Sequence, residues 1–150
     1  MPFPRWLLIC VSVLLFLVVS FGVARWLTRE TRERSAVLAV LRAQVDGDAA
    51  RMVELMPGCA QDAACRDLAR SDARKLRRAG DVKILTYETA TRYALGSARG
   101  NVRVAWDIGT LGNTVVQCVT TARHGFAGFN GAVSVERISA PIGREASCPG

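Results

Sequence analysis

The sequence predicts an α+β protein in which one N-terminal transmembrane helix precedes amphipathic helices packed on a four-stranded antiparallel sheet. Three observations predict it: a long uncharged apolar block near the N-terminus, helical periodicity in the middle of the chain, and alternating β-branched and aromatic residues in the second half. Helices followed by strands are typical of α+β domains, in which helices cover one face of a sheet. A chain of 150 residues has room for about one such domain.

The apolar block runs from Trp6 to Ala24 without a charged residue or a proline. A helix rises ~1.5 Å per residue, so the block would cover roughly 28 Å, close to the ~30 Å hydrocarbon core of a bilayer. We therefore expect a transmembrane helix over residues 6–27, after a short N-terminal tail of residues 1–5. A cleaved signal peptide is the alternative, because Gly22-Val23-Ala24 offers the small residues that a signal peptidase needs.

Arginines and cysteines give opposite predictions for the side of the membrane that the globular domain faces. Arg5 precedes the apolar block and four arginines follow it, so the positive-inside rule alone puts the domain in the cytoplasm. Four cysteines beyond the block, an even number in a small domain, instead favour an oxidising compartment. We favour a single-pass protein of the cell membrane with an extracytoplasmic domain. Free cysteines in a cytoplasmic domain are the alternative.

These four cysteines allow three disulfide pairings. The short segment between Cys59 and Cys65 favours a bond between them, and Cys118 would then pair with Cys148 and tie down a C-terminal tail of residues 143–150. Loop-closure entropy assigns roughly 2–2.5 kcal/mol to the first bond and roughly 3.5–4 kcal/mol to the second. Zinc is disfavoured, because no pair has C-x2–4-C spacing and the chain has one histidine. No metal and no cofactor are expected.

A charged connector of residues 28–35 leads into the globular domain, which we expect over residues 36–142. A helical continuation of the membrane span is the alternative for this connector. The first helix of this domain shows apolar residues at spacings of three and four, at Leu38, Leu41 and Val45. Gly47 is expected to end this helix, and Asp48 to cap a second one that runs to Met56.

A third helix is expected from Asp62 to Ala79. At ~100° per residue its apolar residues gather on one side, whereas another side gathers the basic residues Arg66, Arg70, Arg74, Arg77 and Arg78. This basic stripe has two interpretations. It is either a solvated outer face or a surface that contacts lipid phosphate, an anionic cell-wall polymer or an acidic partner.

After Gly80 the hydrophobic period changes to two. We expect strands at Val82–Arg92, Val102–Ile108, Thr114–Arg123 and Ala132–Ser139. In the second of these, Trp106 and its apolar neighbours two residues apart alternate with Arg103 and Asp107, as in a sheet with one face on the core. The connections are short enough for an antiparallel meander.

The order of these elements resembles the cystatin-like cone of the nuclear-transport-factor-like superfamily, with a GDAA break between two helices at Gly47–Ala50. With the N-terminal span and the stretches VQCV (Val116–Val119) and SCP (Ser147–Pro149), the chain resembles small single-pass envelope proteins of actinobacteria. The resemblance implies a curved sheet, a domain outside the membrane and, as in bitopic proteins of conjugation and secretion machines, a role in protein docking.

The excess positive charge lies mainly beside the apolar block. The chain carries +7, but from Ser35 onward fifteen Lys/Arg and eleven Asp/Glu leave only +4. Arginines beside a membrane span commonly contact lipid headgroups, so we interpret the excess as a membrane flank and expect no nucleic acid partner.

Residues suited to catalysis are sparse. His124 is the single histidine, and the carboxylates on the expected strands are Glu88, Asp107 and Glu136. No phosphate-binding loop, nucleophile elbow or metal-ligand cluster is present in the sequence. Phe126 and Phe129 form an apolar loop tip that is a candidate docking point.

We therefore expect a non-catalytic, membrane-tethered domain that binds another envelope protein. The alternatives are a pocket for a small apolar ligand, an enzyme built on the cone, and a basic surface for an anionic polymer.

Overall fold

The computed structural model describes the backbone of residues 5–94, 97–109, 112–124 and 132–148. It describes the side chains in these ranges as well, except those of residues 5, 8, 25–30, 90–94, 97–98 and 124. The chain divides into two compact units, Met1–Arg32 and Glu33–Gly150.

Helix α1 (Arg5–Asp46) contributes residues to both units. Its large apolar side chains between Trp6 and Val23 are exposed wherever they are described, from 48% for Leu7 to 80% for Trp6. The predicted connector of residues 28–35 is helical, so the apolar block and the first amphipathic helix form one element rather than two. Among the described residues, no helix combines the length and the apolarity needed to cross a membrane.

Gly47 and Asp48 separate α1 from α2 (Ala49–Leu55), as predicted. Gly47 has a φ of +80°, a backbone conformation that residues with a Cβ rarely adopt. Asp48 then accepts a hydrogen bond on its Oδ1 from the backbone N–H of Arg51 at 2.8 Å. The carboxylate thereby satisfies one of the N–H groups that the first turn of a helix leaves unpaired.

Helix α3 (Ala63–Lys75) ends earlier than predicted. The helix was expected to reach Ala79, but its C-cap is Leu76. Two residues later the backbone N–H of Arg78 donates to the carbonyl oxygen of Val45 at 3.0 Å. A tertiary hydrogen bond to the end of α1 thus replaces the local helical hydrogen bond. Periodicity within one helix carries no information about such a partner.

The remainder of the second unit forms one four-stranded antiparallel sheet, in the order β1-β2-β3-β4. Its strands are β1 (Val82–Ala94), β2 (Ser97–Ile108), β3 (Val115–His124) and β4 (Ala132–Ile138). Each strand pairs with the next along the chain, which confirms the predicted meander and leaves β1 and β4 at the edges. Strand β2 begins before the predicted Val102, because Gly100 continues the ladder opposite Thr91 and Thr121.

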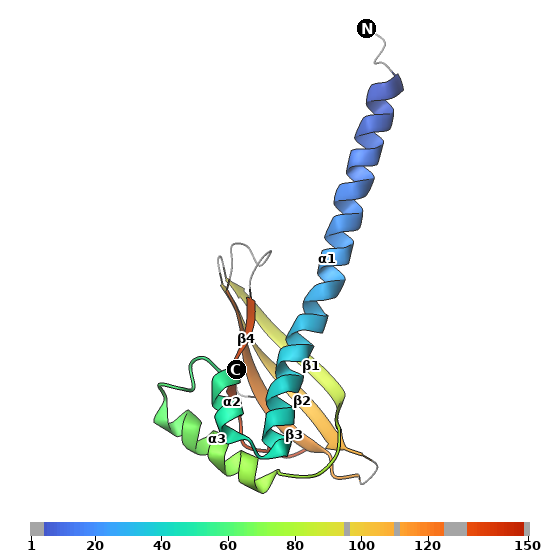
Figure 1. The fold of residues 1–150 in the computed structure, drawn as a ribbon. Helices are drawn as coiled ribbons and strands as arrows, with labels where there is room; N and C mark the ends of the chain where they lie inside the picture. Colours follow the sequence, from blue (N-terminus) through green and yellow to red (C-terminus); the bar gives the residue numbers. More distant parts are fainter. Residues whose placement is uncertain (1–4, 95–96, 110–111, 125–131, 149–150) are drawn as a thin grey trace. The chain divides into compact units, whose positions relative to one another are not determined.

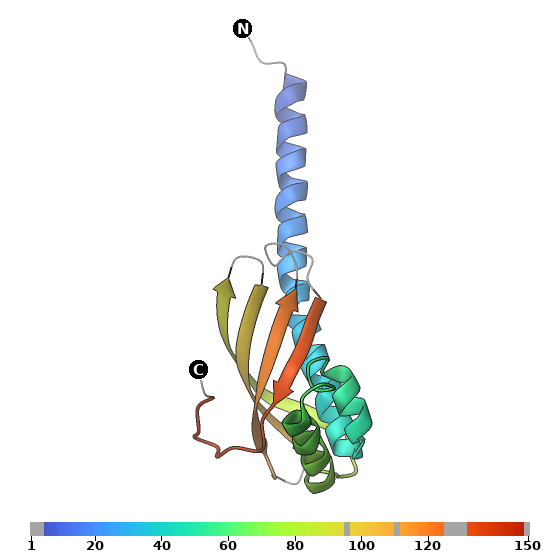
Figure 2. The same cartoon turned by 90° about the vertical axis from the view of Figure 1, so that its left-hand side faces the viewer.

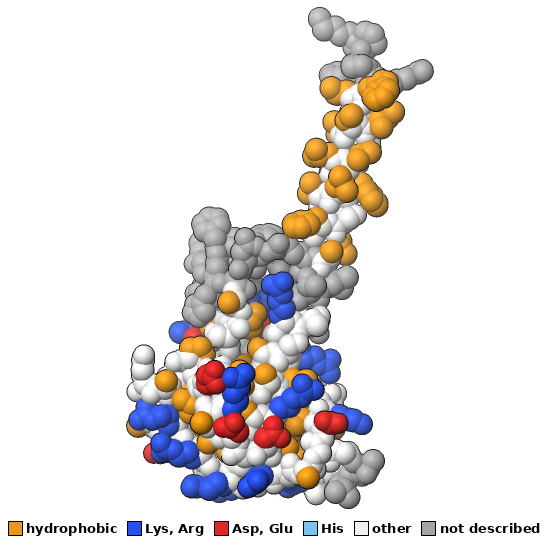
Figure 3. All heavy atoms as spheres, viewed as in Figure 1, with side chains coloured by type: hydrophobic (Ala, Val, Ile, Leu, Met, Phe, Trp, Pro, Cys, Tyr) orange, Lys and Arg blue, Asp and Glu red, His pale blue; other side chains and the backbone are white. Residues whose placement is uncertain are grey.

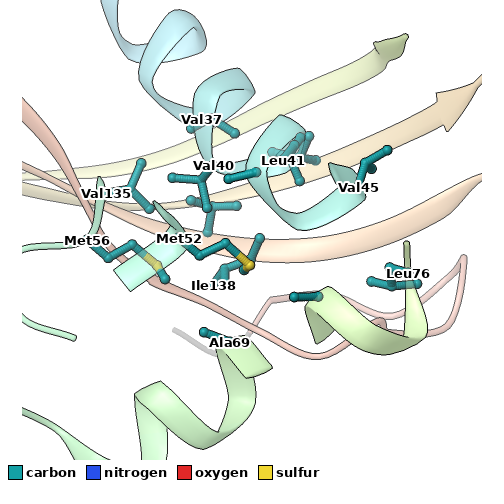
Figure 4. Close-up of a cluster of buried hydrophobic side chains, with 14 of the residues drawn as sticks. Val37, Val40, Leu41, Val45, Met52, Met56, Ala69, Leu76, Val135 and Ile138 are labelled. Carbon is teal, nitrogen blue, oxygen red and sulfur yellow. The ribbon is translucent and has the colours of Figure 1, made fainter. Parts of the chain in front are cut away.

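In the second unit the helices cover one face of the sheet (Figure 1, Figure 2). On β2, Val102, Val104 and Trp106 belong to the core between the layers, as alternation predicts. Figure 4 shows side chains from α1, α2, α3 and β4 that meet in this core. The largest of them are at most 2% exposed: Leu41, Met52, Met56 and Ile138.

A buried polar network joins α1 to the sheet inside this core. The side-chain amides of Gln44 and Gln117 donate to each other at 3.1 and 3.3 Å, and both residues are fully buried. Gln117 also accepts a hydrogen bond from Nε1 of Trp106 at 2.8 Å and donates to the carbonyl oxygen of Ser139 at 2.9 Å. Because a buried polar group without a partner costs ~1–3 kcal/mol, this network fixes how α1 packs on the sheet.

A second polar contact ties the first residue of this unit to β3. Glu33 is 3% exposed and accepts a hydrogen bond from the hydroxyl of Thr121 at 3.0 Å. Its other carboxylate oxygen forms an ion pair with Arg123. A buried carboxylate is tolerated when it is paired and hydrogen-bonded, and these two partners supply both conditions.

Both predicted disulfides are confirmed. Cys59–Cys65 joins the loop after α2 to the first turn of α3, with 5.2 Å between the Cα atoms. Cys118–Cys148 joins β3 to the C-terminal tail, with 5.6 Å between the Cα atoms. Two disulfides in a small domain indicate an oxidising, extracytoplasmic environment.

The C-terminal tail lies on the face of the sheet opposite the helices (Figure 2). The backbone N–H of Ile142 donates to the carbonyl oxygen of Val116 at 2.8 Å. From β2, Arg103 donates through its Nε to the carbonyl oxygen of Ala146 at 3.0 Å and through Nη2 to that of Arg144. A hydrogen bond to β3 just before the tail and hydrogen bonds from β2 within it therefore hold this end of the chain in addition to the disulfide.

Candidate functional site

The five arginines predicted to form an anionic-ligand surface do not share one helix. Arg66, Arg70 and Arg74 lie on α3, whereas Arg77 and Arg78 follow its last residue. Figure 3 shows basic side chains gathered over α3 and the segment after it. The predicted stripe is therefore interrupted at the end of the helix.

Local contacts account for part of this stripe. Arg66 donates to a backbone carbonyl of the preceding loop at 2.6 Å, and Arg70 pairs with Asp67, three residues earlier, at 2.8 Å. The alkyl chain of Arg77 covers Gly47, because a Cβ at that glycine would lie 2.9 Å from its Cδ. Such contacts are typical of a solvated helix face and of a long side chain packed over backbone.

The three carboxylates considered for catalysis are separated in the structure. Asp107 accepts a hydrogen bond from the backbone N–H of the next residue at 2.6 Å. Glu88 pairs with Arg103 at 3.4 Å, and Glu136 pairs with Arg99 at 3.1 Å. Each carboxylate therefore has its own partner. The core between the helices and the sheet is packed with apolar side chains around the Gln44–Gln117 pair.

Three predicted positions lie outside what the structure describes. Phe126 and Phe129, the docking-loop candidates, are outside the described residues. His124 ends β3, and its side chain is not among those described. These three predictions stay open.

The thiols of the domain are engaged in the two disulfides, and Cys10 on α1 is an exposed free cysteine. Within the described part of the chain, no three His, Cys, Asp or Glu side chains come together as a metal site would require.

A groove of about 560 Å³ opens where the loop between α2 and α3 meets the edge strand β4. We name it the β4 groove, and it is lined by Pro57, Gly58, Asp62, Cys65, Arg99, Thr120, Ser134, Glu136 and Arg137. The loop wall is fixed by the Cys59–Cys65 disulfide and by Asp62, whose Oδ1 accepts hydrogen bonds from the first turn of α3 at 2.9 and 3.3 Å. The disulfide and the helix cap thus constrain the loop wall of the groove.

Two ion pairs dominate the polar lining of the β4 groove. Arg99 contacts both carboxylate oxygens of Glu136, through Nε and Nη2, each at 3.1 Å. Arg137 contacts Asp62 at 3.3 Å. The arginine side chains are 73% and 67% exposed, whereas their partners Glu136 and Asp62 are 27% and 39% exposed. The carboxylates therefore lie deeper and orient the guanidinium groups, whose remaining N–H donors are accessible to a ligand.

The hydroxyl groups that line the β4 groove belong to Thr120 and Ser134. The hydroxyl of Thr120 donates to the side-chain oxygen of Asn101 at 3.0 Å rather than to a carboxylate of the groove. A nucleophile needs an adjacent base within hydrogen-bond distance, and this hydroxyl is directed elsewhere. Outward-facing guanidinium groups instead suit an anionic oxygen ligand.

Sequence reasoning missed the β4 groove, because its residues come from the α2–α3 loop and from three strands. Pro57-Gly58 and the short spacing of Cys59 and Cys65 do indicate a constrained loop. Which strand that loop meets depends on the register of the sheet, which no local pattern gives. The sequence around Arg99 and Arg137 therefore did not indicate that these arginines line a groove.

Outside the groove, Asp72 is the group whose acidity is most altered by the fold. It lies on the buried face of α3, is 2% exposed, and its Oδ2 has no hydrogen-bond partner among the described residues. Burial raises the pKa of this carboxyl from 3.8 to about 6, and the charge of Lys75 opposes that shift. Folding therefore favours the protonated form of Asp72 relative to the unfolded chain.

Asp72→Asn is expected to raise the free energy of unfolding at pH 7.5 by about 1–2 kcal/mol, because it removes a buried, unpaired charge. The full pKa shift of Asp72 corresponds to at most about 3 kcal/mol. The side-chain amide of the asparagine is also buried without a partner, so part of the desolvation cost remains. Since the pKa of the folded state is raised, the stability linked to this group is fully present below pH 3.8 and is lost as the pH rises through about 6. Thermal unfolding of the full chain in detergent at pH 4.5 and 7.5 measures the difference. An equal gain at both pH values would contradict this account of Asp72.

The described residues establish an α+β domain of helices followed by a four-stranded antiparallel sheet, with two disulfides. Comparison with models of protein families, with curated proteins and with solved structures finds no match, so no family is identified for this chain.

Proposed function

We propose that this chain is a non-catalytic interaction domain, tethered to the cell membrane by its N-terminal helix, that binds another envelope protein outside the cytoplasm. The observation that carries the proposal is the pair of disulfides, which fix the α2–α3 loop and the C-terminal tail. Such bonds persist in oxidising compartments and are rare in the cytosol. We give them more weight than the arginines after the apolar block, because the charge rule is a statistical bias on orientation.

The membrane tether in this proposal is supported by the full sequence and by exposure. The stretch from Trp6 to Ala24 contains no charge, and its described large apolar side chains are 48–80% exposed. Exposed apolar area of this kind is unfavourable in water, at ~25 cal/mol per Å², and is favourable in hydrocarbon. A bilayer is the environment that suits such a helix.

A docking role is supported by the arrangement of the polar groups. The core between helices and sheet is filled by side chains such as Trp106, which is 1% exposed and whose N–H is used in the Gln117 network. Ligand-binding sites are usually clefts lined by apolar groups with a few converging polar ones. The β4 groove instead lies on the surface and presents paired charges, as the rim of a protein interface does.

The cystatin-like cone is the finer fold that we propose for the domain. Its support is the order of the elements, with the part of α1 from Glu33 onward packed along one face of an open antiparallel sheet of four strands. The resemblance to single-pass envelope proteins of actinobacteria agrees with the disulfides and with the apolar helix, and it makes an envelope protein the partner that we propose.

Replacing Leu14 and Leu17 together by arginine is expected to release the chain from isolated membranes on extraction with alkaline carbonate. Each arginine near the centre of a membrane helix costs about 2.5–3.5 kcal/mol on insertion scales. The control is Leu85→Arg, which places one arginine on an exposed leucine of β1 and should leave the chain in the membrane fraction. Extraction of the unaltered chain by carbonate would contradict the tether.

A further inference from the structure

We infer that the β4 groove binds an acidic segment of a partner protein, and that Arg99 and Arg137 contact the carboxylates of that segment. The inference rests on the proposed docking function and names its surface and the chemistry of its partner. It starts from the exposure of the two ion pairs, in which the arginines face outward and the carboxylates lie beneath them.

The geometry of each pair leaves donors free for a second acceptor. A guanidinium group carries five N–H donors, and Glu136 engages Arg99 through Nε and Nη2, which leaves Nη1 available. Arg137 uses Nη2 for Asp62, which leaves its Nε and Nη1 available. Because the deeper carboxylates restrict the arginine rotamers, less conformational entropy is lost when a ligand carboxylate binds.

Charge complementarity favours an acidic partner over a second copy of this chain. The part of the chain from Ser35 onward carries a net charge of +4, so two copies repel each other, whereas an acidic protein is attracted. The groove also exposes Ser134 and Pro57 beside the arginines, which gives a segment polar and apolar contacts in addition to ionic ones.

The same lining disfavours an anionic polymer. The lining contains the carboxylates of Glu136 and Asp62 as well as the two arginines, so a polymer with a charge on every unit would meet negative charge as well as positive. Like-charge contacts at an interface act against the wrong partner. A protein segment with acidic residues spaced between uncharged ones meets this pattern without such repulsion.

Display of random short peptides tests the inference on the purified full chain in lipid nanodiscs. The selected peptides are expected to be enriched in Asp and Glu. Binding of the leading peptide should fall by at least about tenfold in a chain with Arg99→Gln and Arg137→Gln, because hydrogen bonds to charged groups contribute ~1.5–3 kcal/mol each.

The matched control carries Arg51→Gln and Arg70→Gln. These arginines also belong to exposed ion pairs, with Glu54 at 2.6 Å and Asp67 at 2.8 Å, so the control loses the same charge and the same kind of contact outside the groove. Its peptide affinity should stay within about twofold of the unaltered chain. Exposed pairs contribute ~0–1 kcal/mol, so both variants should fold, and thermal unfolding checks this.

Three results would overturn the inference: no acidic enrichment among the selected peptides, an equal loss of affinity in the two double variants, or tighter binding of inorganic polyphosphate than of any selected peptide to the groove. The assay uses purified protein, so its outcome does not depend on the compartment or on the membrane orientation. A failure here with an intact tether and intact disulfides would remove the groove from the docking function without removing that function.

Discussion

Replacing Gln117 by leucine is expected to lower the free energy of unfolding by about 3–5 kcal/mol, although the two side chains are similar in size. The change leaves the Nε1–H of Trp106 and the amide of Gln44 without their buried partners, and each unsatisfied group costs ~1–3 kcal/mol. The carbonyl oxygen of Ser139 loses its donor as well. Chemical unfolding of the full chain in detergent measures the loss.

A double-mutant cycle separates this network from simple loss of packing. Leucine at both Gln44 and Gln117 removes both halves of the amide pair, so the double variant should be less destabilised than the sum of the single variants. Gln61→Leu is the matched control, because that glutamine is exposed and its replacement should change stability by at most ~0.5 kcal/mol. Additive single effects would show that the two amides do not act as a pair.

Replacing Cys118 and Cys148 by serine is expected to lower the free energy of unfolding by about 3.5–4 kcal/mol. The bond closes a loop with a sequence separation of 30 residues, and the loss of that closure releases entropy in the unfolded chain. The tail then depends on its hydrogen bonds to β3 and to Arg103, so cleavage by trypsin after Arg144 should accelerate.

The other disulfide supplies the comparison. Cys59–Cys65 has a sequence separation of 6, so serine at both positions should cost only about 2–2.5 kcal/mol and should leave the rate of tail cleavage unchanged. A larger loss from the short bond than from the long one would contradict the entropic account.

The architecture of the domain was largely predictable because its local signals agree with one another. Gly47 and Asp48 mark a helix boundary through a positive φ angle and an N-cap hydrogen bond, both of which are local. The alternation of apolar and polar residues around Trp106 identifies the face of β2 that meets the core. The disulfide pairing followed from the short spacing of Cys59 and Cys65. In each case the residue type and its near neighbours are sufficient.

Features that depend on tertiary partners were not predictable. After α3 ends, the backbone N–H of Arg78 binds the carbonyl oxygen of Val45, which is distant in sequence. The polar residues of the connector did not decide whether it is helical, and the structure shows it as part of one long α1. The β4 groove depends on the register that brings Arg99 and Glu136 together across strands. The predicted arginine stripe extends past the end of α3 at Lys75, so its last two members are not placed by the helix.

Thiol labelling in intact cells tests most directly the central claim that the domain lies outside the cytoplasm with its cysteines in disulfides. The chain carries Cys10→Ser, so that only the four domain cysteines remain. Intact cells are treated with a membrane-impermeant reductant or left untreated, then labelled with an impermeant maleimide. A parallel sample is lysed before it is labelled. The account predicts no labelled thiols without reductant and four with it. Thiols that label without reductant, and only after lysis, would place the domain in the cytosol with its cysteines free and would contradict the account.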